Sequence, residues 1–130
     1  MSVGLLIMTH SDIGQSLYNT AVAIIGAATL ETEILAVSMD SEPEKKLEKA
    51  RHFVNRLNSG DGVLILTDMY GATPSNVATE LLNSKTILVS GLNLPMLLRV
   101  MNYPELHLNE LAEKAITGGQ EGVLSITAKG

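Results

Sequence analysis

Two short apolar runs decide the fold of this chain: VGLLIMTH at residues 3–10 and VLILTD at residues 63–68. Each is a nearly continuous hydrophobic run, typical of a strand buried on both faces of a parallel sheet. A polar turn and a helical pattern follow each run. Parallel strands of this kind end at the edge of the sheet where ligands bind. We therefore expect His10, which ends the first run, and Asp68, which ends the second, to lie side by side at that edge.

Outward from these runs, strand-like segments alternate with helical patterns, which indicates an α/β fold with a mainly parallel sheet. The apolar spacing predicts a helix that begins at Ser11 or Asp12 and ends at Gly26, followed by a strand near residues 33–39. The sequence SEPE at residues 41–44 is typical of a capping box with proline in the first turn, so it predicts the start of the next helix.

The second half of the chain continues the same alternation. The expected elements are a helix from Pro74 or Ser75 to about Leu82, a strand at residues 86–89, a helix from Pro95, a helix from Leu108 that stops at Gly118 and Gly119, and a short fifth strand at residues 123–127. Together they predict a doubly wound sheet of four strands with helices on both faces, plus a short C-terminal strand. No linker divides the chain, so we expect one domain over residues 1–130.

The composition limits the classes of function. With a net charge of −5, the chain lacks the basic face that nucleic acid requires. It has no cysteine, which excludes disulfides and thiol catalysis and is consistent with a reducing compartment. No apolar run reaches the ~20 residues of a membrane span, and the N-terminus lacks the cationic start of a signal peptide. We expect a soluble, cytoplasmic domain without membrane insertion.

The chemistry expected at the sheet edge centres on an imidazole and a carboxylate. Asp68 could accept a hydrogen bond from one nitrogen of His10 and stabilise positive charge on the ring as the other nitrogen reacts. Backbone N–H groups at residues 12–14, at a helix N-terminus, could bind an anion. Thr73, Ser75 and the turn amides from Gly71 onward would add donors. This combination favours phosphoryl transfer through the histidine.

Other interpretations of these residues remain open at this point. His10 could be a hydrogen-bonding residue after a strand, Asp68 could cap the turn behind it, and Thr73 could be an ordinary turn residue. His52 and His107 lack metal-ligand spacing with His10, so no metal site is predicted. The motifs GxGxxG, GxxxxGK(S/T) and GxSxG are absent, which leaves dinucleotide binding, nucleoside-triphosphate binding and serine hydrolysis without their usual signatures.

At these residues the chain closely resembles the enzyme IIA domains of the mannose family of the bacterial phosphoenolpyruvate-dependent sugar phosphotransferase system. The resemblance spans nearly the whole chain. It rests on four segments in the same order: GLLIMTHS at residues 4–11, LTDMYGATPSN at residues 66–76, GLNLPML at residues 91–97 and GQEGV at residues 119–123. It implies a doubly wound α/β fold, a cytoplasmic location and a homodimer that exchanges the strand expected at residues 123–127.

By resemblance, His10 receives a phosphoryl group from the phosphohistidine carrier HPr and passes it to an enzyme IIB component. Asp68 would orient the ring and leave Nε2 as the phosphorylated nitrogen, and Thr73 would hydrogen-bond at the site. The family usually has Gly-Gly-Ser-Pro-Phe-Asn where residues 71–76 are GATPSN. Ala72 removes the freedom of a second glycine, and Ser75 replaces an apolar contact near the partner surface.

The sequence therefore predicts a phosphotransferase component that works as a phosphohistidine carrier, in sugar uptake or in a regulatory phosphorelay. No metal or organic cofactor is expected, since the phosphoryl donor is a protein, and the carrier would associate with a IIC/IID membrane complex. The alternatives are a regulatory binding module of the same fold and the related subunit that phosphorylates a dihydroxyacetone kinase. The expected catalytic residues are His10 and Asp68, and the expected phosphate-binding residues are Ser11, Asp12, Gly71, Ala72 and Thr73.

Overall fold

A parallel sheet lies at the centre of the chain. The computed structural model describes residues 2–38 and 40–128, and in these residues four strands pair in the order β2-β1-β3-β4, all parallel. The strands are β1 (Gly4–His10), β2 (Thr32–Val37), β3 (Val63–Thr67) and β4 (Thr86–Ser90). The predicted doubly wound sheet is confirmed. The second strand ends at Val37, and the expected end at Met39 lies outside the described residues.

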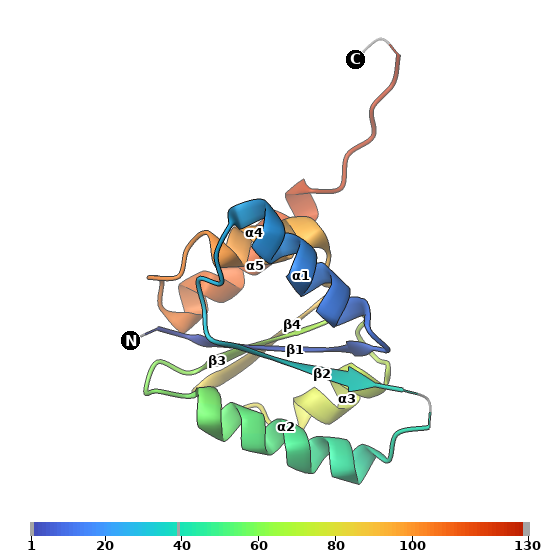
Figure 1. Ribbon diagram of the computed structural model, residues 1–130, viewed down its shortest axis with the longest axis vertical. Helices are drawn as coiled ribbons and strands as arrows, with labels where there is room; N and C mark the ends of the chain where they lie inside the picture. The colour runs from blue at the N-terminus through green and yellow to red at the C-terminus, as the bar shows by residue number, and fades with distance from the viewer. Residues whose placement is uncertain (1, 39, 129–130) are drawn as a thin grey trace.

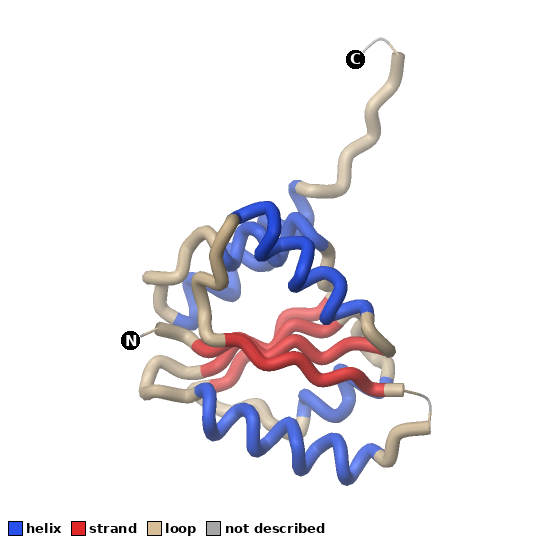
Figure 2. The backbone as a smooth tube through the Cα atoms, viewed as in Figure 1, coloured by secondary structure: helices blue, strands red, loops and turns tan. Residues whose placement is uncertain are grey.

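Helices cover both faces of this sheet (Figure 1). On one face lie α1 (Ile13–Ile25), α4 (Leu94–Met101) and α5 (Leu108–Glu121), and on the other lie α2 (Pro43–Leu57) and α3 (Thr73–Thr79), as Figure 2 also shows. The chain steps from β1 outward to β2 and then back across β1 to β3. Because parallel crossovers are right-handed, these opposite steps place α1 and α2 on opposite faces.

The alternation of side chains along β1 divides the core into two parts. Leu5 and Ile7 belong to the apolar cluster beneath α1, α4 and α5, whereas Leu6 and Met8 belong to the cluster beneath α2 and α3. Successive residues of a strand point to opposite faces. The next residue, Thr9, therefore points toward α1.

The predicted helix stop at Gly118 and Gly119 is wrong, because α5 continues past both glycines and packs closely against α4. The helix runs on to Glu121, with both glycines buried inside it. A Cβ atom on Gly118 would lie 2.5 Å from Cβ of Arg99, and one on Gly119 would lie 2.9 Å from Cε of Met96. These glycines allow two helices to approach closely, and they do not end the helix.

Two predictions about helix ends were also wrong. The predicted capping box at residues 41–44 does not form: Glu42 is the N-cap and its side chain makes no capping bond. The hydroxyl of Ser41 instead accepts the backbone N–H of Ser38, at 2.9 Å, and so closes the turn before the helix. The third helix ends at Thr79, short of Leu82, because the chain tightens into turns through residues 80–82.

Residues 123–128 leave α5 as an extended arm that points away from the body of the chain (Figure 1). Among the described residues nothing pairs with this segment, so the strand expected at residues 123–127 does not form within one chain, and its exchange with a second copy stays a prediction. A strand forms through ladder bonds to a neighbouring strand, whereas Val123, at the base of the arm, lines a hollow beside β4 without pairing with it. The apolar residues of the arm are 75–80% exposed, namely Val123, Leu124 and Ile126.

Candidate functional site

The pairing of β1 with β3 brings the two predicted side chains to one edge of the sheet. The register matches Gly4 with Val63 and, at the far end, Met8 with Thr67. The chain leaves the sheet just beyond Thr67, at Asp68, and His10 ends β1 beside it. Because the strand order reverses between β1 and β3, this edge is the switch point of the sheet, where doubly wound folds open a crevice.

A hydrogen bond of 2.9 Å joins Nδ1 of His10 to Oδ2 of Asp68. The backbone N–H of His10 donates to the same oxygen, at 3.2 Å. An ionised carboxylate only accepts hydrogen bonds, so in the neutral imidazole Nδ1 carries the proton and Nε2 keeps its lone pair. The predicted meeting of the two side chains is confirmed, and it fixes one tautomer of the imidazole.

The two partners differ in their access to solvent. The side chain of His10 is 37% exposed, whereas that of Asp68 is 13% exposed. Among the described residues Oδ1 of Asp68 is buried without a hydrogen-bond partner, so the contacts of the carboxylate are concentrated on His10 through Oδ2. A partly buried carboxylate in this position stabilises positive charge on the ring more strongly than one in water.

The first turn of α1 presents fewer free amides than the sequence predicts. The backbone N–H of Gly14 donates to Oγ1 of Thr9 at 2.8 Å, and that of Ser11 donates to the carbonyl of Val37 at 3.3 Å. The expectation that the amides of residues 12–14 all point into the crevice is therefore wrong for Gly14. Ser11 and Asp12 are exposed beside His10, and Asp12 is the N-cap of the helix.

The turn after β3 forms the opposite wall of the site. Gly71 adopts a positive φ of 85°, and its N–H donates to Oγ of Ser75 at 2.9 Å. Ser75 is fully buried and its hydroxyl lies 3.3 Å from the carbonyl of Ala72. The prediction that Ser75 offers a donor to the crevice or faces a partner is wrong, because this hydroxyl closes the turn from inside. Thr73 is exposed at the start of α3.

A hollow of about 280 Å³ lies in front of the imidazole. The structure brings together here His10, Gly71, Ala72 and Thr73, as predicted from sequence, while Ser11 and Asp12 lie outside the lining. The sequence analysis missed three residues that also line the hollow, which are Val37, Ser38 and Asn76. Their positions in the sequence could have indicated them. Val37 and Ser38 lie at the end of the strand next to β1, and Asn76 lies three residues after Thr73 on the same helix.

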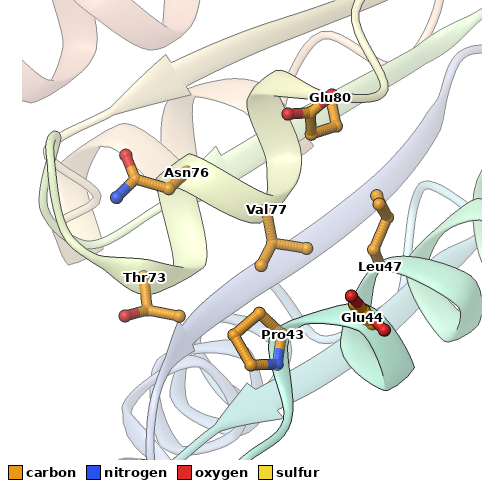
Figure 3. A pocket seen from close by; sticks show the side chains of 7 residues that line it. All are labelled: Pro43, Glu44, Leu47, Thr73, Asn76, Val77 and Glu80. Atoms are coloured by element: carbon orange, nitrogen blue, oxygen red, sulfur yellow. The ribbon is translucent and has the colours of Figure 1, made fainter.

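A second hollow, of about 300 Å³, lies between α2 and α3. The two hollows share Thr73 and Asn76. Figure 3 shows these two residues on α3, with Pro43, Glu44 and Leu47 on the facing start of α2. The imidazole lines the first hollow, whereas the lining of the second hollow does not include His10.

The described part of the chain offers neither a cluster of metal ligands nor a helix able to span a membrane. No group of three or more His, Asp or Glu side chains there is arranged to hold a metal ion. Within the same residues, every helix is too short or too polar to cross a membrane.

Comparison with known proteins identifies relatives of the whole domain. The chain is 29% identical over 133 aligned residues to the "PTS system mannose-specific EIIAB component" of Escherichia coli (strain K12). The alignment covers 99% of this chain and 41% of the relative. The chain thus spans about two fifths of the length of that curated relative.

Two solved structures share the fold. The mannose/sorbose-specific IIA subunit of the phosphotransferase system from Enterococcus faecalis superposes with a TM-score of 0.87 at 25% identity, covering 98% of this chain and 96% of that one. The PTS IIA protein associated with the fucose utilization operon from Streptococcus pneumoniae superposes with a TM-score of 0.82 at 22% identity, covering 96% of both chains. The second likeness concerns the fold alone.

The family model described as "EIIA-man: PTS system fructose IIA component" matches residues 4–116. This range contains the whole sheet, both strand ends and the turn that forms the second wall of the site. The chain therefore belongs to this family of phosphotransferase-system IIA components.

Proposed function

We propose that the chain is a phosphohistidine carrier, which accepts a phosphoryl group from phospho-HPr on Nε2 of His10 and passes it to an enzyme IIB component. The family supports phosphotransfer as the general activity. The observation that carries the finer proposal is the 2.9 Å bond between Nδ1 of His10 and Oδ2 of Asp68. That bond leaves Nε2 as the nitrogen with a free lone pair, on a ring that is partly exposed.

In the proposed step, the lone pair of Nε2 attacks the phosphorus atom of the donor's phosphohistidine. A new N–P bond forms on His10 as the N–P bond of the donor breaks, and the electron pair of the broken bond stays on the donor nitrogen. Nδ1 of His10 keeps its proton, so the ring gains positive charge that Asp68 stabilises. Transfer to IIB reverses these roles. Proteins contribute to such a step mainly through positioning and charge.

The proposed phosphate contacts come from both walls of the site. On the first wall they are the hydroxyl of Ser11 and the backbone of Asp12, at the N-terminus of α1. On the second wall they are the backbone of Ala72 and the hydroxyl and backbone of Thr73. The N–H of Gly71 already donates to Ser75, so Gly71 contributes through the shape of the turn.

The surroundings of the ring support docking of protein partners. Ile13, Met69 and Tyr70 flank the two strand ends in sequence, and their side chains are exposed. Apolar side chains beside a reactive group suit transient interfaces, which bury little area and release the partner after transfer. On this proposal the carrier acts in the cytoplasm, with HPr and IIB as alternating partners and a IIC/IID complex at the membrane. The regulatory module and the dihydroxyacetone-kinase subunit are not favoured by the comparisons.

Incubation with phosphoenolpyruvate, enzyme I and HPr, followed by intact-mass spectrometry, tests the proposal. We expect the wild-type protein to gain one acid-labile phosphoryl group of about 80 Da, and His10→Ala to gain none. His52→Ala, which removes an exposed histidine of α2, is the matched control and should be phosphorylated like wild type. Absence of transfer to the wild-type protein from a cognate HPr would overturn the carrier assignment.

The second prediction concerns the carboxylate. Asp68→Asn keeps the size of the side chain but removes the charge that fixes and stabilises the ring. We expect a folded protein whose transfer rate from phospho-HPr falls about 10- to 100-fold. Rapid-quench kinetics measure the rate, and Asp61→Asn, far from His10 in the loop before β3, is the charge-matched control. Equal rates in Asp68→Asn and wild type would remove this carboxylate from the mechanism.

We also propose that the arm at residues 123–127 pairs with a second copy of the chain. The arm is apolar and exposed, and β4 is an edge strand whose outer side, within the described residues, is unpaired beyond the bridge from Thr86 to Asn83. A hollow of about 260 Å³ lies beside β4, and Val89 and Ile116 are among the side chains that line it. An unpaired edge strand readily accepts a strand from another chain.

Deletion of residues 123–130 should therefore lower the mass measured by sedimentation from that of a dimer to that of a monomer. Ile126→Asp, which places a charge on the arm without shortening it, should weaken the dimer in the same direction. A truncated protein that sediments with the mass of the full-length protein would reject the exchange.

A further inference from the structure

The end of β1 is held more firmly on one side than on the other. On the β2 side the ladder extends to His10 and Val37, and the N–H of Ser11 continues it. On the β3 side the ladder ends at Met8 and Thr67. Beyond that point, the contacts of His10 with the β3 segment are the two bonds to Asp68. A further contact joins the end of β1 to the start of α1.

The hydroxyl of Thr9 makes that contact. Thr9 is 1% exposed and faces α1. Its Oγ1 accepts the backbone N–H of Gly14 at 2.8 Å, and its hydroxyl donates to the carbonyl of His10 at 3.1 Å. One side chain thus joins the start of the helix to the backbone of the reactive residue. A short turn, residues 10–14, is closed by these two bonds.

Two features show how tightly this turn is built. A Cβ atom on Gly14 would lie 2.7 Å from Cγ2 of Ile7 and 3.1 Å from Oγ1 of Thr9, so the helix rests directly on the strand. Within the turn, Ser11 has a φ of 47°. This left-handed conformation is unfavourable for a residue with a side chain, and it persists where surrounding contacts enforce it.

We propose that Thr9 is a positioning residue for the phosphoryl-accepting ring of His10. Its hydroxyl fixes the backbone of the turn, so that Nδ1 stays on Asp68 and Nε2 faces the hollow. Thr9 acts through this turn and does not touch the phosphoryl group, since it points beneath α1 while His10 lines the hollow bordered by α3. The role of Thr9 in phosphoryl transfer rests on the function proposed above. Its effect on the position and tautomer of the His10 ring does not depend on that function.

Three variants separate the hydroxyl from the bulk of the side chain. Thr9→Val keeps the shape and removes the hydroxyl, and Thr9→Ser keeps the hydroxyl and removes the methyl group. Thr86→Val removes a hydroxyl from another buried threonine, at the opposite end of the sheet, and serves as the control. The first measurement is ¹⁵N NMR of the His10 ring in the unphosphorylated protein, because ring shifts report the tautomer directly.

We expect Thr9→Val to lower the fraction of the ring with its proton on Nδ1, and Thr9→Ser and Thr86→Val to keep the wild-type shifts. Transfer from phospho-HPr should slow about 10-fold in Thr9→Val alone, since small misplacements of a reacting group are costly. Ring shifts in Thr9→Val equal to those of wild type would overturn the proposal. So would altered ring shifts in Thr9→Ser, a test that stands even where Thr9→Val fails to fold. A wild-type protein that accepts no phosphoryl group would overturn the carrier function. The ¹⁵N shifts of the His10 ring would still decide whether Thr9 positions that ring.

Discussion

The parallel pairing of β1 with β3 is the constraint on which the site depends, because it fixes where two chain segments 58 residues apart leave the sheet. Ladder bonds and two layers of buried aliphatic side chains hold this register. A slip of one residue would turn each side chain of the strand to the other face. His10 would then point beneath α1, and Asp68 would lose its partner. The packing of the apolar core thus determines how His10 and Asp68 are placed relative to one another at the edge of the sheet.

On the proposed function the site must meet two opposed requirements, and the geometry of the two strand ends is compatible with both. A carrier histidine must be reached by other proteins, whereas its carboxylate partner is most effective away from water. His10 is exposed enough to be reached, while Asp68 is mostly covered by the chain. Their separation is that of one hydrogen bond, so an accessible nitrogen and a shielded charge lie on opposite sides of one ring.

The parts of this structure that follow from local pattern could be predicted from the sequence. Apolar runs identified the strands, and the position of His10 and Asp68 at their ends predicted the contact between them. Features that depend on tertiary packing could not be predicted in this way. The role of Gly118 depends on the approach of α4, and the bond from Gly14 to Thr9 depends on where α1 rests. The arm at residues 123–127 forms no strand within one chain because a strand requires a neighbour, which local pattern does not specify.

The proposed chemistry stands or falls on which ring nitrogen carries the phosphoryl group. Protein labelled with ¹⁵N in its histidines can be phosphorylated through HPr and examined by ¹⁵N and ³¹P NMR at alkaline pH, where the N–P bond survives. We expect the phosphoryl group on Nε2 of His10, with the proton retained on Nδ1 against Asp68. A phosphoryl group on Nδ1, or on another histidine, would contradict this proposal.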